Sequence, residues 1–315
     1  MASIDATYSL NYRGEFPEIE VEGIEFNKPE FLCKCYSFNE RNIAATISRK
    51  IFVSTPDLFN DLFDSLYLKI NVVPEDFEFY KRLLSYVSLP IDKEEFLTSM
   101  KYRDKLRNSL SAIWTTKTGI LCTTELSTND LMWAHYTNNE GFLIQFDYCK
   151  FSENFGNPIP INYLKSDEFN KYVYSDHMLQ LYVNSLIKKC DWSYENEYRF
   201  IVHPAQEKTF LTSGRFSNED HDSYPKESRL QTYSAECVKK VILGFNFFKS
   251  LITNGNRVDF GKSGGLLKKA LLDYTFKEGI KTEMLVMNPG DMKFKPIQFT
   301  SEKIRELLFE IKYAS

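Results

Sequence analysis

The stretch Lys188–Val202 reads KKCDWSYENEYRFIV and joins a tryptophan to alternating carboxylates and an aromatic, β-branched run. This composition predicts a strand that is entered from a loop, because aromatic and β-branched residues favour strands. Alternate side chains of a strand share a face, so Glu195, Glu197 and Arg199 are expected to point one way. The opposite face, expected to rest on a core, carries Tyr194, Tyr198, Phe200 and Val202.

A row of two carboxylates and a guanidinium has two interpretations. Paired carboxylates serve acid/base catalysis or stabilise a developing positive charge. The same row is equally typical of a solvated strand face with a cross-strand ion pair. From this segment alone, both interpretations stay open.

The bulk composition is that of a globular protein with appreciable β structure. The 315 residues suffice for one large domain or two small ones, and 43% of them are hydrophobic and 26% charged. The 26 Phe and 19 Tyr favour strands and cores. A formal net charge of −4 argues against bulk attraction to nucleic acid or to an anionic membrane.

The six cysteines are scattered and form no C-x-x-C pair. This pattern predicts reduced core thiols in a cytoplasmic protein, and no metal site is expected. The N-terminus lacks a secretory signal pattern, and no apolar run approaches the roughly 18 residues typical of a membrane helix. We therefore expect a cytoplasmic protein without a membrane partner.

The order of elements predicts one α+β domain over residues 31–300, with mixed, mostly antiparallel sheets. Residues 1–30 are acidic and sparsely patterned, and we expect an N-terminal arm there. Helical spacing at about 75–114 predicts a helical insertion, and the polar stretch 205–233 predicts a mobile loop. A final helix is expected over 301–315. Regular βαβ alternation is missing, which favours α+β over α/β.

Two helices are expected near the carboxylate row. One runs from about Ser175 to Lys189 and leads into it. The other, Leu131–Tyr136, carries Trp133, His135 and Tyr136. Such an aromatic stripe is usually core, and a lone histidine is more often structural than functional. The alternative is an aromatic wall on which a flat ring stacks.

Oxygen-bearing side chains gather in the turn that follows a strand at Lys50–Ser54, namely Ser54, Thr55, Asn60, Asp61 and Asp64. Turn and cap chemistry accounts for such residues, and the alternative is the rim of a binding pocket or a metal site. The chain has no H-E-x-x-H, G-x-S-x-G or G-x-G-x-x-G motif. Zinc proteases, serine hydrolases and Rossmann enzymes therefore gain no support.

Three long, ordered segments resemble the bacterial domain-of-unknown-function family 2971 over about residues 31–300. Phe52–Asp64 is similar to the family's F-S-x-P-x-x-F-N-D-P-F-D. Met132–Tyr136, followed by a Gly-Phe pair, is similar to M-W-x-H-Y with G-F. Lys189–Arg199 is similar to K-x-x-W-x-Y-E-x-E-x-R.

The chain departs from that family at two places. Leu62 replaces the proline of N-D-P. The opening strand L-Y-K-Y-R-S corresponds to Leu32–Ser37, which keeps Lys34 but lacks both tyrosines and the arginine. The family itself names no activity.

The order of a basic residue on an early strand, a strand that ends in Ser-Thr and a late E-x-E strand also resembles ADP-ribosyltransferases, some of which act as toxins or in phage defence. The residues that carry this resemblance are Lys34, Ser54, Thr55, Glu195 and Glu197. It implies an enzyme that uses NAD as its nucleotide substrate and modifies a protein or nucleic-acid acceptor. It also leaves room for a homo-oligomer or an antitoxin partner.

The resemblance implies a role for each residue. Glu197 would contact the ribose and stabilise the cation, and Glu195 would position or activate the acceptor, with Arg199 beside them. Breaking the nicotinamide–ribose bond makes an oxocarbenium-like sugar, which a carboxylate stabilises. Glu197→Gln is then expected to abolish NAD turnover and to leave folding intact. The nucleotide would be held by Lys34, Ser54 and Thr55. The pocket-rim and aromatic residues, which the resemblance does not carry, are expected to complete this site: Asn60, Asp61, Trp133, His135, Tyr136 and Trp192.

Two other functions stay open. A metal-dependent nuclease would bind Mg²⁺ through Asp61, Asp64, Glu195 and Glu197, with Lys189 near the phosphate. A non-catalytic sensing or interaction module would use the same acidic and aromatic residues as an interface or as structural support.

Overall fold

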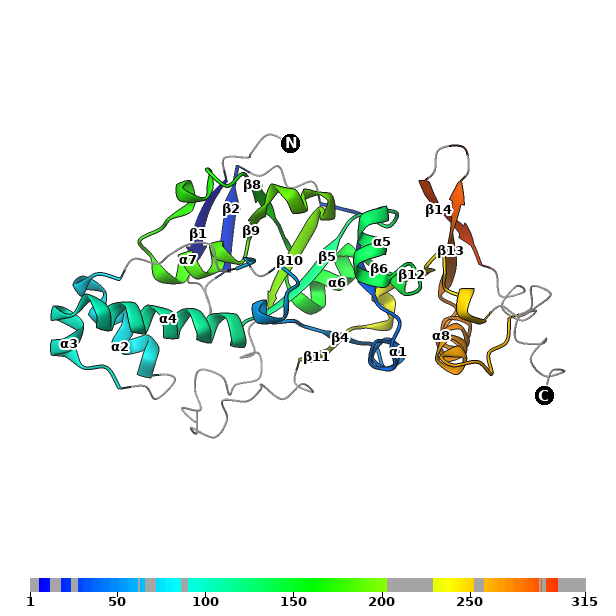
Figure 1. Ribbon diagram of the computed structural model, residues 1–315, viewed down its shortest axis with the longest axis horizontal. Coiled ribbons are helices and arrows are strands. Elements are labelled where there is room, and N and C mark those ends of the chain that lie inside the picture. Colours follow the sequence, from blue (N-terminus) through cyan, green and yellow to red (C-terminus); the bar gives the residue numbers. More distant parts are fainter. Residues whose placement is uncertain are drawn as a thin grey trace.

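The computed structural model describes residues 6–11, 18–23, 28–61, 63–65, 72–85, 90–202, 229–251, 258–288, 290 and 293–299. Within these residues the centre of the fold is a sheet of eight strands (Figure 1). In spatial order they are β14 (Lys293–Gln298), β13 (Lys281–Asn288), β12 (Val238–Leu243), β6 (Phe142–Asp147), β3 (Phe31–Tyr36), β5 (Gly119–Thr124), β10 (Glu197–Val202) and β7 (Ile159–Pro160). All neighbours are antiparallel except β12 and β13. The predicted α+β fold with a mixed, mostly antiparallel sheet is thus confirmed.

Smaller sheets surround this centre. β4 (Lys50–Phe52) pairs with β11 (Leu230–Thr232), and β8 (Asn162–Leu164) pairs in parallel with β9 (Ile187–Lys189). β11 lies inside the range where a mobile loop was expected. The part of the expected loop that comes before residue 229 lies outside the described residues. The helix expected over 301–315 also lies outside them.

Within residues 1–30, where an N-terminal arm is expected, the described residues contain two strands. β1 (Thr7–Asn11) and β2 (Glu18–Glu22) pair in antiparallel register. Tyr8 of β1 is buried, and its ring meets that of Tyr172 edge-on at 5.9 Å between centroids. The apolar residues are few, but they alternate on one face, which is enough for a short strand to dock on a core.

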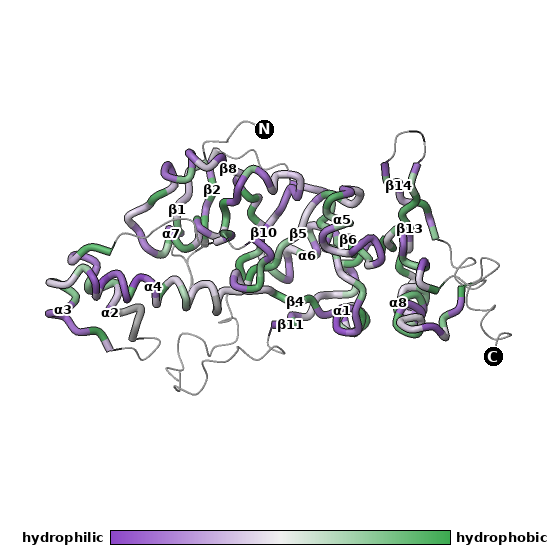
Figure 2. Tube along the Cα trace, in the orientation of Figure 1, coloured by the Kyte–Doolittle hydropathy of each residue, from purple (hydrophilic) through white to green (hydrophobic). Residues whose placement is uncertain are grey.

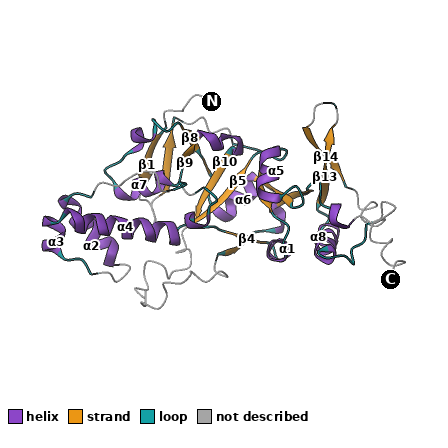
Figure 3. Cartoon of the chain, in the orientation of Figure 1, coloured by secondary structure: helices purple, strands orange, loops and turns teal. Residues whose placement is uncertain are grey.

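The helices lie around the sheet and beyond its ends (Figure 3). They are α1 (Glu40–Ile47), α2 (Phe77–Ser85), α3 (Lys93–Thr98), α4 (Met100–Lys117), α5 (Asp130–Thr137), α6 (Tyr148–Phe155), α7 (His177–Asn184) and α8 (Gly265–Lys277). α2, α3 and α4 come between β4 and β5 in the chain, where a helical insertion was expected, and lie together at one end of the molecule, with α8, β13 and β14 at the other (Figure 1). Among the described residues, no helix is both long and apolar enough to cross a bilayer.

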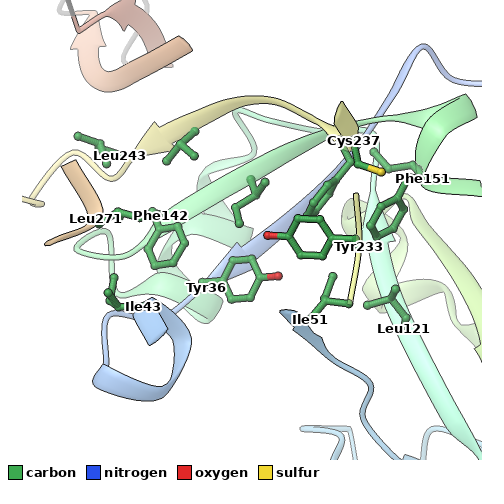
Figure 4. Close-up of a cluster of buried hydrophobic side chains, with 14 of the residues drawn as sticks. Tyr36, Ile43, Ile51, Leu121, Phe142, Phe151, Tyr233, Cys237, Leu243 and Leu271 are labelled. Carbon is green, nitrogen blue, oxygen red and sulfur yellow. The ribbon is translucent and has the colours of Figure 1, made fainter. Parts of the chain in front are cut away.

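The main core lies where β3, β4 and β6 face α1. Tyr36, Ile43, Ile51 and Phe142 point into it (Figure 4), and the rings of Tyr36 and Phe142 stack at 5.1 Å. Each large apolar side chain buried here stabilises the fold by about 1.5–3 kcal/mol. Apolar residues recur along the central strands, whereas the first half of α4 is mostly polar (Figure 2).

Candidate active site

A pocket of about 270 Å³ lies where β3 and β5 contribute to the same wall. β3 pairs with β6 through six residue pairs, but with β5 only through Cys33 and Thr124. The backbones of β3 and β5 therefore lack a continuous ladder, and side chains from both strands reach the pocket. Among them are Lys34 of β3 and Cys122 of β5.

The pocket gathers residues that are far apart in the sequence. Besides Asp64 and Lys188, its lining includes these predicted site residues: Lys34, Ser54, Asn60, Tyr136, Glu195, Glu197 and Arg199. Asn60 and Tyr136 lie close to one another, since the Asn60 amide donates to the Tyr136 hydroxyl at 3.5 Å. Glu195 and Glu197 thus line a pocket, which the interpretation of this pair as an active site requires.

The aromatic wall expected from Trp133 and His135 does not form. Trp133 is buried in a core cluster with Leu143 and Ile242, and its indole Nε1 donates to the carbonyl of Ser127 at 2.9 Å. His135 is exposed, with its ring 6.3 Å from that of Tyr194. Of the three residues predicted for the aromatic wall, only Tyr136 lines the pocket.

The other predicted nucleotide-binding residues lie beside the pocket and do not line it. Thr55 is buried, and its hydroxyl donates to Asp57 and accepts from Arg229 at 2.8 Å. Asp61 is also buried, and its Oδ1 accepts from the backbone N–H of Phe63 at 3.0 Å. This is the turn chemistry that Ser, Thr, Asp and Asn commonly supply.

Trp192 covers a cation from outside the pocket. Its ring lies 4.9 Å from Nζ of Lys188. An aromatic face attracts an ammonium group in this geometry, so Trp192 supports the site through Lys188.

Glu195 reaches the pocket from a different element than the sequence predicted. It ends the 3₁₀ helix Cys190–Glu195, and β10 begins only at Glu197. Asn196 lies between them in the left-handed conformation, with φ 42°, which asparagine adopts more readily than most residues. This turn lets Glu195 and Glu197 point into one pocket although only Glu197 belongs to the strand.

Helix α5 brings Tyr136 to Glu195. Asn129 caps the helix, because its Oδ1 accepts from the N–H of Met132 at 3.0 Å. The amide of the same Asn129 donates to the carbonyl of Tyr194 at 2.8 Å. The helix is therefore tied to the residue next to Glu195, and the Tyr136 hydroxyl donates to Oε1 of Glu195.

Arg199 is the centre of a buried ionic network. It is 1% exposed, and its Nε and Nη2 donate to the two oxygens of Glu197 at 2.7 and 3.1 Å. Its Nη1 and Nη2 donate to the two oxygens of Asp64 at 2.8 and 2.6 Å. Two bidentate pairs on one guanidinium fix both carboxylates in place.

Lys188 was missed as a site residue. Its Nζ lies 2.6 Å from Glu195 Oε2, 3.2 Å from Glu197 Oε2 and 3.7 Å from Asp64 Oδ2. The helix expected to continue to Lys189 ends at Asn184, and Lys188 belongs to β9. The two adjacent lysines before the tryptophan are the sequence signal that could have indicated a cation in the site. Lys189, which was assigned to a phosphate, has its Nζ 4.5 Å from the centre of the Phe63 ring.

The pKa values of the two neighbouring glutamates, Glu195 and Glu197, are shifted in opposite directions. Burial raises the pKa of Glu195, against the opposing attraction of Lys188. Burial also disfavours the ionised form of Glu197, but Arg199 and Lys188 outweigh it and lower the pKa of Glu197. One carboxyl is thus suited to exchange a proton and the other to keep a charge.

The pKa of Glu197 makes stability depend on pH. The pKa is lower in the folded state than in the unfolded one, so the native state gains stability above the unfolded value of about 4.3. That contribution is lost as the pH falls below this value. Denaturant unfolding at pH 7, 5 and 4 should therefore show a steeper acid loss for the wild type than for Glu197→Gln. An equal dependence of the free energy of unfolding on pH in the two proteins would contradict this prediction.

The acidic groups of the pocket are already paired with protein cations. Asp64, Glu195 and Glu197 bind Lys188 and Arg199. In the described part of the chain, no group of three or more His, Cys, Asp or Glu side chains is placed to hold a metal ion. A divalent cation would have to displace these ion pairs.

No protein-family model, no curated protein and no solved structure matches the chain. The resemblance to family 2971 stays a prediction, and the function of the pocket has to be argued from its chemistry.

Proposed function

We propose that the protein is an NAD-using enzyme of the ADP-ribosyltransferase type, with its chemistry in the pocket of Glu195 and Glu197. The observation that carries the proposal is the pair of adjacent carboxyls with opposed pKa shifts in one pocket. Lys34 and Ser54, the other two pocket residues named by the resemblance, line the same hollow.

The pocket has an excess of negative groups around the point where charge would develop. Asp64, Glu195 and Glu197 face Lys188 and Arg199. Burial lowers the pKa of Lys34, which weakens its contribution to the positive charge of the pocket. Such a site favours a cationic nicotinamide ring and the oxocarbenium-like ribose that follows from it, and preorganised charge of this kind stabilises a transition state strongly.

Each glutamate then has one task. The ribose C1′–N bond breaks, and its electron pair goes to the nicotinamide nitrogen. Glu197, held ionised, opposes the positive charge that grows on the ribose. The acceptor nucleophile bonds to C1′ and gives its proton to Glu195, which acts as general base. A volume of about 270 Å³ suits the nicotinamide-ribose end of NAD, with the rest of the dinucleotide outside.

The experiment is an NAD turnover assay with purified wild-type protein. We expect nicotinamide release, or transfer of labelled ADP-ribose to components of a cell lysate, and no effect of EDTA. We also expect NAD to raise the melting temperature, because a ligand that binds only the folded state stabilises it. The absence of both NAD consumption and labelling would overturn the proposal. EDTA-sensitive cleavage of DNA or RNA would favour the nuclease.

Tyr136 gives a test of how Glu195 is positioned. Tyr136→Phe removes the hydroxyl that donates to Glu195 and keeps the ring. A hydrogen bond to a charged group contributes about 1.5–3 kcal/mol, so NAD turnover should fall roughly 10- to 100-fold with the fold retained. His135→Ala, at the exposed neighbouring position, is the matched control and should leave turnover unchanged. Equal effects of the two changes would speak against the assigned role.

A further inference from the structure

The pocket holds two lysines in opposite surroundings. Lys188 lies within 3.7 Å of three carboxylates. Nζ of Lys34 donates to the carbonyl of Cys122 at 3.2 Å, and Lys34 forms no ion pair with any residue the structure describes. Asp64, Glu195 and Glu197 are already engaged with Lys188 and Arg199.

These surroundings shift the pKa values of the two amines in opposite directions. Burial alone would lower the pKa of Lys188, but the three carboxylates outweigh it and raise that pKa, so this lysine stays an ammonium. Burial lowers the pKa of Lys34, with only weaker opposing contributions, the largest from Cys122. Lys34 is thus a desolvated lysine with no ion-pair partner among the described residues, and this is the setting that activates a lysine side chain as a nucleophile.

We propose that Lys34 is a nucleophilic amine that condenses reversibly with a small aldehyde or ketone held in this pocket. The Nζ lone pair bonds to the carbonyl carbon, and the carbonyl electron pair moves to oxygen, which takes up a proton. Nitrogen then loses a proton, the hydroxyl leaves as water after a second protonation, and a C=N bond forms. Water reverses the reaction, so no oxidant or reductant is needed.

Two features of the pocket support this chemistry. Glu195 lines the same hollow, and its raised pKa suits it to deliver and recover the proton that the departing water needs. The volume of about 270 Å³ lies below the range of about 300–1,000 Å³ for drug-sized ligands, so the carbonyl compound has to be small. The proposal is independent of NAD chemistry.

The test uses wild-type protein, D-glyceraldehyde and sodium cyanoborohydride at pH 7, with the labelled lysines identified by peptide mass spectrometry. Lys239 is the comparison residue, because it is half-exposed and pairs with Asp147 at 2.8 Å. We expect Lys34 to be labelled faster than Lys239, because a lowered pKa makes the neutral amine more abundant at pH 7. Lys188, in the same pocket, should stay unlabelled.

A pH series sharpens the test. Between pH 7 and pH 9 the labelling of Lys239 should rise roughly 100-fold, because an ordinary lysine is still mostly protonated there. The labelling of Lys34 should rise less steeply, because burial lowers its pKa. Labelling of Lys34 that is no faster than that of Lys239, or that rises as steeply with pH, would overturn the proposal. NAD is absent from this experiment, so its failure and a failure of the NAD assay are separate results.

Discussion

Replacing Arg199 with methionine is expected to lower the free energy of unfolding by about 3–5 kcal/mol, the cost of breaking a buried ion pair by removing one partner. The change leaves Asp64 and Glu197 buried, and it takes from them the guanidinium that donates four hydrogen bonds. Lys188 remains, but its Nζ is 3.7 Å from Asp64 and 3.2 Å from Glu197. Denaturant unfolding followed by circular dichroism measures the loss.

The control for Arg199→Met is Arg107→Met. Arg107 pairs with Asp104 at 2.9 Å on α4 and is partly exposed, and ion pairs near the surface contribute about 0–1 kcal/mol. A double variant, Arg199→Met with Asp64→Asn, should lose less than the sum of the two single changes, because the two residues share one interaction. Equal losses at Arg199 and Arg107 would show that the buried network does not stabilise the fold.

Glu195→Gln is expected to lower NAD turnover by about 10²–10⁴-fold, the usual contribution of a general acid or base. The amide has the shape of the carboxyl but cannot take up a proton. The fold should be retained, because burial already disfavours the ionised form of Glu195, and Lys188 still has Glu197 and Asp64 as partners. Nicotinamide release and denaturant unfolding are the two readouts.

Glu197→Gln is the matched comparison for Glu195→Gln. The folded state favours the ionised form of Glu197, so this change should lower both NAD turnover and the free energy of unfolding. From the sequence alone Glu197 is the residue expected to be replaceable without unfolding, and its burial against Arg199 revises that expectation. If Glu195→Gln keeps full turnover, the assigned role fails; if it unfolds as Glu197→Gln does, a structural module becomes the better account.

The local pattern of the sequence determined which residues of β10 share a face. Glu197 and Arg199 point to the pocket, while Tyr198 and Phe200 belong to the main core. The alternation follows from the period of two that every strand has, so it needs no tertiary information. The order of the predicted strands and helices, which lacks regular βαβ alternation, likewise sufficed to predict the α+β class.

Contacts across long sequence separations were decided only by the tertiary structure. Asp64 and Arg199 are 135 residues apart, and no local pattern indicates that they form a bidentate pair. The predicted helix up to Lys189 hid Lys188, because helix and strand assignments of a short apolar run depend on what packs against it. Packing also decided which residues of α5 face the pocket: Tyr136 lines it, whereas Trp133 belongs to the core. Periodicity tells which side chains point together, and packing alone tells what they point at.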